Sequence, residues 1–121
     1  MITDGLLAPM LVAVGGSAGA VGRYLVGRRI PGRRATALVN VVGSVLLGAV
    51  GGAVSAGYPL TLGMLVGTGF CGAFTTYSSF AVEFHRLLDE GEWRSVAVFG
   101  LGTLFAALLG AVVGRSLVGI T

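Results

Sequence analysis

The sequence predicts an all-α membrane protein with four transmembrane helices, the third of which is broken. Of its 121 residues, 55% are hydrophobic and only 11% are charged, and the mean hydropathy is +0.92. A soluble domain carries about 25% charged residues, so this composition fits lipid as the main solvent. Four apolar segments are each long enough to cross a hydrocarbon core of about 30 Å.

Short turns separate the four segments, so we expect residues 1–121 to form a single four-span subunit. The spans are placed at about residues 6–26, 35–56, 60–88 and 95–118. Pro31 and Gly32 lie in the first connection, Gly57 and Pro59 lie in the second, and the third is the acidic run 89–92. Proline and glycine are typical of such turns.

The net charge is +3, and every basic residue is an arginine. A positive net charge can indicate nucleic acid binding. Here the arginines lie at the ends of apolar runs, so we expect contact with a lipid bilayer and no nucleic acid. Cys71 is the only cysteine, which excludes an intrachain disulfide.

Small residues recur four apart in every span, for example Gly15 and Gly19 in the first and Ser44 and Gly48 in the second. Helices in lipid associate by close approach over such faces. We expect a tight bundle that encloses little space of its own. Dimerisation is then the natural way to form a pore.

Hydroxyl residues gather in the third span. The run Thr75–Ser79 holds two threonines and two serines, and Glu83 follows one turn later. Three glycines precede this run, and each lowers helix propensity by about 1 kcal/mol relative to Ala. Irregular backbone at membrane depth is tolerated where it is buried or lines a cavity. We therefore predict a helix break near Gly72–Thr76.

Three other polar residues within or at the ends of spans have structural alternatives that the sequence leaves open. Asn40 can line a pore or hydrogen-bond between helices. Thr103 can line a pore or bond to its own backbone four residues earlier. Arg23, at the end of the first span, can face a pore or reach to the membrane surface.

Tyr77 and Phe80 are three residues apart and share a helical face. Aromatic rings have a negative face and a positive edge, so ring edges in a narrow pore can attract a small anion without a fixed charge. The alternative is that the pair only packs within the bundle.

Three motifs lie in the first three spans: GGSAGAVGRY at Gly15–Tyr24, ALVNVVG at Ala37–Gly43 and GAFTTYSSFAVE at Gly72–Glu83. They resemble, in that order, the first-span, second-span and third-span motifs of the CrcB (Fluc) fluoride channel family. The motifs occur in the expected order, and the resemblance covers the whole chain.

The resemblance implies an antiparallel dimer of four-span subunits with two narrow fluoride pores and a structural sodium ion at the dimer centre. Carried over to this sequence, the sodium ligands are the backbone carbonyls of Gly72 and Thr75. The pore aromatics fall on Tyr77 and Phe80, and the pore asparagine falls on Asn40.

The polar track would continue along the hydroxyls of Ser78 and Ser79 to Glu83, and we add Arg23 and Thr103 as further pore candidates. This sequence departs from the family pattern in having Tyr77 where a phenylalanine is usual. The fourth span contributes only Thr103 to the track.

The implied activity is passive transport and not enzymatic catalysis. Hydrogen fluoride crosses lipid as a neutral molecule and ionises in the cytoplasm, where the anion is trapped. A fluoride channel in a bacterial-type inner or plasma membrane lets the anion leave. An inside-negative potential assists by about 2.3 kcal/mol per charge per 100 mV.

The arginines are distributed unevenly between the two ends of the predicted bundle. The first and third connections share one side of the membrane and carry six arginines, whereas the other side carries only Arg115. Basic residues favour the cytoplasm, which predicts both termini outside it. The second subunit is then a second copy of this chain or an oppositely oriented paralogue. The six arginines are Arg28, Arg29, Arg33, Arg34, Arg86 and Arg94.

Two rival functions can be compared with the sequence. A small multidrug exporter subunit also has four spans, but it needs a carboxylate inside the first span, and Asp4 precedes that span. A non-conducting partner subunit of a heterodimeric fluoride channel is the second rival. The presence of Asn40 and Phe80 argues against it.

Overall fold

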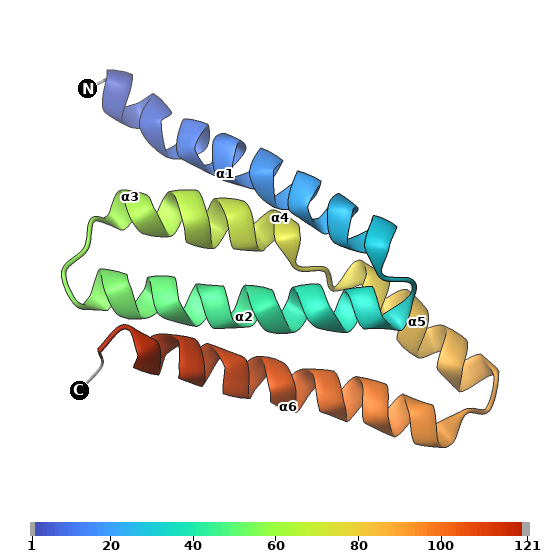
Figure 1. The fold of residues 1–121 in the computed structure, drawn as a ribbon. Coiled ribbons are helices and arrows are strands. Elements are labelled where there is room, and N and C mark those ends of the chain that lie inside the picture. Colours follow the sequence, from blue (N-terminus) through green and yellow to red (C-terminus); the bar gives the residue numbers. More distant parts are fainter. Residues whose placement is uncertain (1, 120–121) are drawn as a thin grey trace.

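The computed structural model describes residues 2–119, and all regular structure within that range is helical (Figure 1). Four helical stretches are long and apolar enough to cross a membrane, which confirms the predicted four-span fold. Three are the continuous helices α1 (Ile2–Arg29), α2 (Arg33–Ser55) and α6 (Trp93–Leu117). The remaining stretch, which is the third span in chain order, is divided into α3 (Leu60–Leu62), the π-helix η1 (Gly63–Cys71), α4 (Gly72–Phe74) and α5 (Ser78–Asp89).

The third span changes neighbours halfway along its length. Up to α4 it lies between α1 and α2, whereas α5 contacts α6 (Figure 1). The break between α4 and α5 therefore carries the third span across α2. Short connections at residues 56–59 and 90–92 join this span to α2 and α6.

Glycines allow the long helices to approach closely. A Cβ atom at Gly15 or Gly19 of α1 would overlap backbone carbonyl oxygens of η1. A Cβ atom at Gly48 would likewise overlap the carbonyl of Ala111 across the α2–α6 contact. These are the small-residue faces on which helices associate in lipid.

The third helix is broken near Gly72–Thr76, as the sequence predicts, and the break lies toward the end of that region. Gly72 itself is the first residue of α4 and is helical. The backbone turns out of the helix at Thr75, where ψ is 162°, and α5 begins at Ser78. Glycine only weakens a helix, and here the flanking turns keep Gly72 helical.

Many apolar side chains face outward on the long helices, as a lipid environment requires. On α1 they include Met10 and Val14, which are 60% and 64% exposed, and on α6 Phe105 is 64% exposed. The connection at 56–59 lies at the end of the bundle where α1 begins and α6 ends (Figure 1). The first and third connections, with their arginines, lie together at the opposite end.

Candidate functional site

The break in the third span is held by the side chain of Asn40 on α2. Its Nδ2 donates a hydrogen bond to the backbone carbonyl of Thr76 at 2.9 Å, and its Oδ1 accepts one from the Thr76 N–H at 2.7 Å. The amide thus pairs both backbone groups of a residue that has left the helix. An unpaired buried backbone group costs roughly 1–3 kcal/mol, so Asn40 is a principal reason that the break is stable.

Hydroxyl groups form hydrogen bonds with backbone groups at the two helix ends that flank the break. The Thr75 hydroxyl donates to the carbonyl of Cys71 at 2.9 Å, one turn back in the preceding helix. The Thr76 hydroxyl accepts from the N–H of Ser79 at 3.1 Å, which is the bond that caps a helix N-terminus. A 3.3 Å contact joins the hydroxyls of Thr76 and Ser78.

An open groove of about 680 Å³ runs beside the break, between α2, η1 and α6. It brings together six of the residues that the sequence proposes for the site, although they come from three separate spans. Those six are Asn40, Gly72, Thr75, Tyr77, Phe80 and Thr103.

The polar groups of the groove retain hydrogen-bonding capacity. An asparagine amide has two N–H donors, and only one N–H of Asn40 is used at Thr76. The Thr103 residue is buried, yet within residues 2–119 its hydroxyl makes no hydrogen bond, so the expected alternative of a bond to its own backbone is not observed. By contrast, the hydroxyls of four other residues bond to the carbonyl four residues earlier: Ser17, Ser44, Thr75 and Ser116.

Aromatic rings form one side of the groove around Phe80. Its ring centroid lies 5.0 Å from that of Phe99, 5.9 Å from that of Phe84 and 6.3 Å from that of Tyr77. Aromatic contacts from both α5 and α6 therefore hold the Phe80 ring in place. Tyr77 is 82% exposed, so this chain leaves one of the two proposed pore aromatics almost uncovered.

A second cavity, of about 510 Å³, lies on the other side of the break between α1 and α2. It contains Arg23 and Ser79, and Thr76 lines both cavities and forms part of the wall between them. The Arg23 guanidinium reaches the Thr75 carbonyl at 3.4 Å. The predicted site residues are thus divided between two cavities.

Two of the predicted residues line neither cavity. Ser78 is exposed at the start of α5, where it contacts the Thr76 hydroxyl. Glu83 lies further along α5 with a side chain only 16% exposed, and its Oε2 is 3.7 Å from Nη1 of Arg86. The structure gives Glu83 an ion-pair partner within its own helix.

Sequence reasoning missed several residues that line or support the groove. Thr76, Ser44 and Thr68 line it, and Phe99 supports Phe80. Ser44 and Thr76 carry a signal in the sequence, because each is a polar residue close to one already proposed. Phe99 is four residues before Thr103, a spacing that puts both on one helical face.

The composition of the groove favours a small anion. Among the described residues, none that line it is acidic, whereas N–H and O–H donors come from Asn40 and Thr103, and Phe80 can present a ring edge. Such edges carry partial positive charge. The arrangement can replace the water around a small anion without a fixed counter-charge.

Comparisons with known proteins identify one family. The profile of the family described as "CrcB-like protein, Camphor Resistance (CrcB)" matches residues 10–115. The chain is 51% identical to "Fluoride-specific ion channel FluC 2" of Natronomonas pharaonis, over 93% of this chain and 95% of that protein. It is 40% identical to "Fluoride-specific ion channel FluC 1" of Geobacillus kaustophilus, over 91% of this chain and 100% of that protein.

Proposed function

The chain belongs to the CrcB-like protein family, and on this premise we propose that it is a subunit of a passive, fluoride-selective ion channel. The observation that carries the proposal is the groove beside the broken third span. Its donors, at Asn40 and Thr103, and the ring of Phe80 suit a small, strongly hydrated anion, which binds only where several good partners replace water. Relatives with high identity over nearly their full length are named as fluoride-specific channels.

The conducting unit is a dimer in this proposal, because a polar groove that is open to lipid is unfavourable. Polar groups at membrane depth need partners from protein or a water-filled cavity. A second subunit, arranged antiparallel, would cover the groove and the exposed ring of Tyr77. Two subunits then form two grooves, and hence two pores.

A sodium ion at the dimer centre is also part of the proposal, and the chemistry of the break supports it. In a continuous helix the Gly72 carbonyl would accept from the Thr76 N–H, but that N–H bonds to Asn40. The Gly72 carbonyl is thereby released from the helical pattern. The Thr75 carbonyl already accepts from Arg23 at 3.4 Å, so a cation there would share this oxygen. Carbonyl oxygens at a helix break suit Na⁺.

The proposed role is the export of cytoplasmic fluoride across a bacterial-type inner or plasma membrane. The driving forces are the fluoride gradient and the membrane potential, so no energy-coupling domain is required. Hydrogen fluoride that enters from an acidic medium ionises at near-neutral pH, and the channel releases the trapped anion.

The test is growth in fluoride of bacteria that lack their own fluoride exporter. We expect this chain to restore growth, alone or together with an oppositely oriented paralogue. The Phe80→Ile variant should fail to do so because it loses the ring edge. Phe84→Ile is the matched control, since Phe84 also stacks on Phe80 but does not line the groove. Equal growth of cells with the wild type and with Phe80→Ile would contradict the proposed pore, provided that the proteins are present at equal levels.

A further inference from the structure

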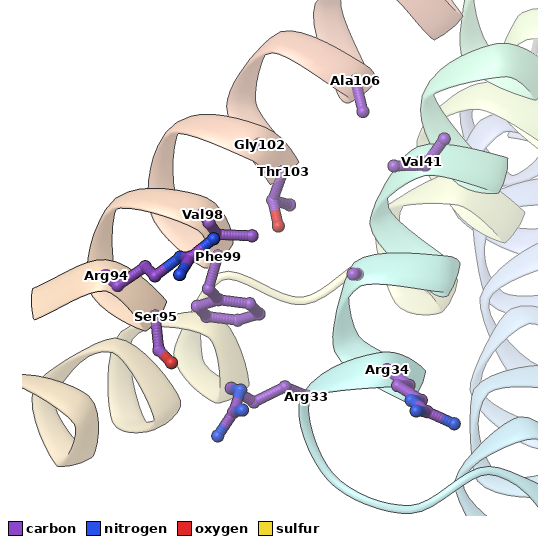
Figure 2. A pocket seen from close by; sticks show the side chains of 11 residues that line it. Arg33, Arg34, Val41, Arg94, Ser95, Val98, Phe99, Gly102, Thr103 and Ala106 are labelled. Atoms are coloured by element: carbon purple, nitrogen blue, oxygen red, sulfur yellow. The ribbon is translucent and has the colours of Figure 1, made fainter. Parts of the chain in front are cut away.

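A third cavity, of about 440 Å³, lies between α2 and α6 at the arginine-rich end of the bundle (Figure 2). The two helices touch closely near their other ends, where Gly48 meets Ala111 and Gly114 meets the carbonyl of Val45. Toward Arg33 and Arg94 they diverge, and the cavity occupies the wedge between them.

The mouth of this cavity is basic. Figure 2 shows Arg94 extending along the α6 side of the cavity toward Phe99, and Arg33 reaching from α2 toward α6. Arg34 also borders the cavity, but its side chain extends away from α6 (Figure 2). Within residues 5–119, whose side chains are described, neither Arg33 nor Arg94 has a salt-bridge partner.

The walls below the mouth are apolar and built mostly from small side chains. Only Ser95 and Thr103 add hydroxyls, and no acidic residue is present among the described lining residues. From Arg33 to Val41 the wall extends about 12 Å along α2, at 1.5 Å per residue. The apolar lining consists of Ala37, Val41, Val98, Phe99, Gly102 and Ala106.

We propose that this cavity binds an anionic phospholipid, with the phosphate at Arg33 and Arg94 and an acyl chain along the apolar walls. The ligand must be both anionic at one end and apolar at the other, because the mouth is basic and the walls are apolar. A hydrated inorganic ion matches only the mouth. Basic pockets between helices at a membrane surface are suited to lipid headgroups, and the guanidinium group pairs well with phosphate.

The site is separate from the proposed fluoride groove in chemistry, although Thr103 borders both cavities. The phosphate end lies at the membrane surface, and the acyl chain ends near Ala106. The lipid would fill the wedge between α2 and α6 and hold their diverging ends at a fixed separation. This inference concerns lipid binding and does not depend on fluoride conduction.

The test is lipid retention by the purified full-length protein, measured by native mass spectrometry. Phosphatidylglycerol should be retained in preference to phosphatidylcholine. The Arg33→Gln/Arg94→Gln variant should retain about 25-fold less, or about fivefold per arginine, because each arginine near an anionic surface contributes about 1 kcal/mol. The matched control is Arg28→Gln/Arg29→Gln, which removes the same charge from the same end of the bundle. Neither residue lines this cavity, so the control should retain lipid normally.

A second variant tests the apolar half of the cavity with both arginines in place. A Cβ atom at Gly102 meets nothing within 4 Å, so the larger side chain of Gly102→Leu begins in open space and extends into the wedge. It should lower retention about tenfold, equivalent to the loss of roughly two buried methylene groups. Retention that is unchanged in both variants would overturn the proposal.

Two other outcomes would also overturn it. Competition by glycerol phosphate as effective as that of the full lipid would mean that the mouth is a simple phosphate site. If Gly102→Leu dissociates the dimer without changing lipid retention, the wedge between α2 and α6 is filled by the second subunit and not by a lipid.

Discussion

At the scale of single residues, Asn40 has two roles that a single amide can fill at once. One N–H and the Oδ1 pair the backbone of Thr76, and the second N–H is available to the groove. An aspartate has the same shape but no N–H donor. It would also place a negative charge beside the route that we propose for an anion.

We therefore predict that Asn40→Asp nearly abolishes fluoride flux. A fixed charge about 5 Å from the ion costs roughly 3 kcal/mol at an effective dielectric constant of about 20, which corresponds to a rate about 100-fold lower. Ser44→Ala is the matched control, because the Ser44 hydroxyl lines the same groove but donates to the Asn40 carbonyl on its own helix. Flux is measured from liposomes, and gel filtration checks the dimer. Wild-type flux in Asn40→Asp would exclude Asn40 from the pore.

The sequence is informative about those residues that stand out against an apolar background. Asn40 and Thr103 are polar within spans, and both line the groove. Aromatic character alone could not single out Phe99, because Phe105 in the same span is equally aromatic yet 64% exposed; only the spacing of Phe99 from Thr103 distinguishes it. The pairing of Asn40 with Thr76 joins residues 36 positions apart, and no local pattern encodes it.

At the scale of elements, the contact between α1 and the third span depends on the absence of side chains. Gly15 lies so close to η1 that a Cβ atom would overlap the carbonyl oxygen of Leu65. This contact positions η1, and through η1 it positions the break. Gly27, on the same helix, faces open space, where a Cβ atom would meet nothing within 4 Å.

Gly15→Ala should therefore destabilise the fold by about 1–3 kcal/mol, the usual cost of overpacking. Gly27→Ala should be neutral or slightly stabilising, since alanine is the better helix former by about 1 kcal/mol. The measurement is the fraction of protein that stays folded after heating in detergent, monitored by gel filtration. Equal losses in the two variants would show that the close approach at Gly15 does not stabilise the bundle.

For the third span, the sequence predicts that the helix is broken but not where each segment begins and ends. Its break could be predicted because glycines and hydroxyl residues weaken a helix together. Its exact bounds could not, because the helix ends where Asn40 hydrogen-bonds the backbone of Thr76, which is a tertiary contact. The π-helix Gly63–Cys71 has no local signal either, since its wider hydrogen-bond spacing depends on packing against α1 and α2.

At the scale of the whole molecule, the uneven distribution of arginines bears on the identity of the second subunit that we propose. The end of the bundle formed by the first and third connections carries six arginines, and the opposite end carries only Arg115. An antiparallel homodimer requires one sequence to insert in both orientations. A bias of this size favours one orientation, and hence an oppositely oriented paralogue as the natural partner.

We predict that the chain inserts with both termini outside the cytoplasm. A single cysteine at Tyr58, in a Cys71→Ala background, should react with a membrane-impermeant reagent in intact cells. A cysteine at Arg29 should react only after the cells are opened. An even mixture of orientations would contradict the idea of a paralogous partner and would support the homodimer.

The most direct test of the central claim is ion efflux from liposomes that contain the purified protein, with fluoride and chloride compared under the same conditions. If the groove conducts fluoride selectively, fluoride should leave roughly 100-fold faster than chloride, a difference of about 2.7 kcal/mol in the barrier. Chloride efflux as fast as fluoride efflux would contradict the selectivity that we assign to the groove. Efflux of neither ion, from the chain alone and with its paralogue, would contradict the channel itself.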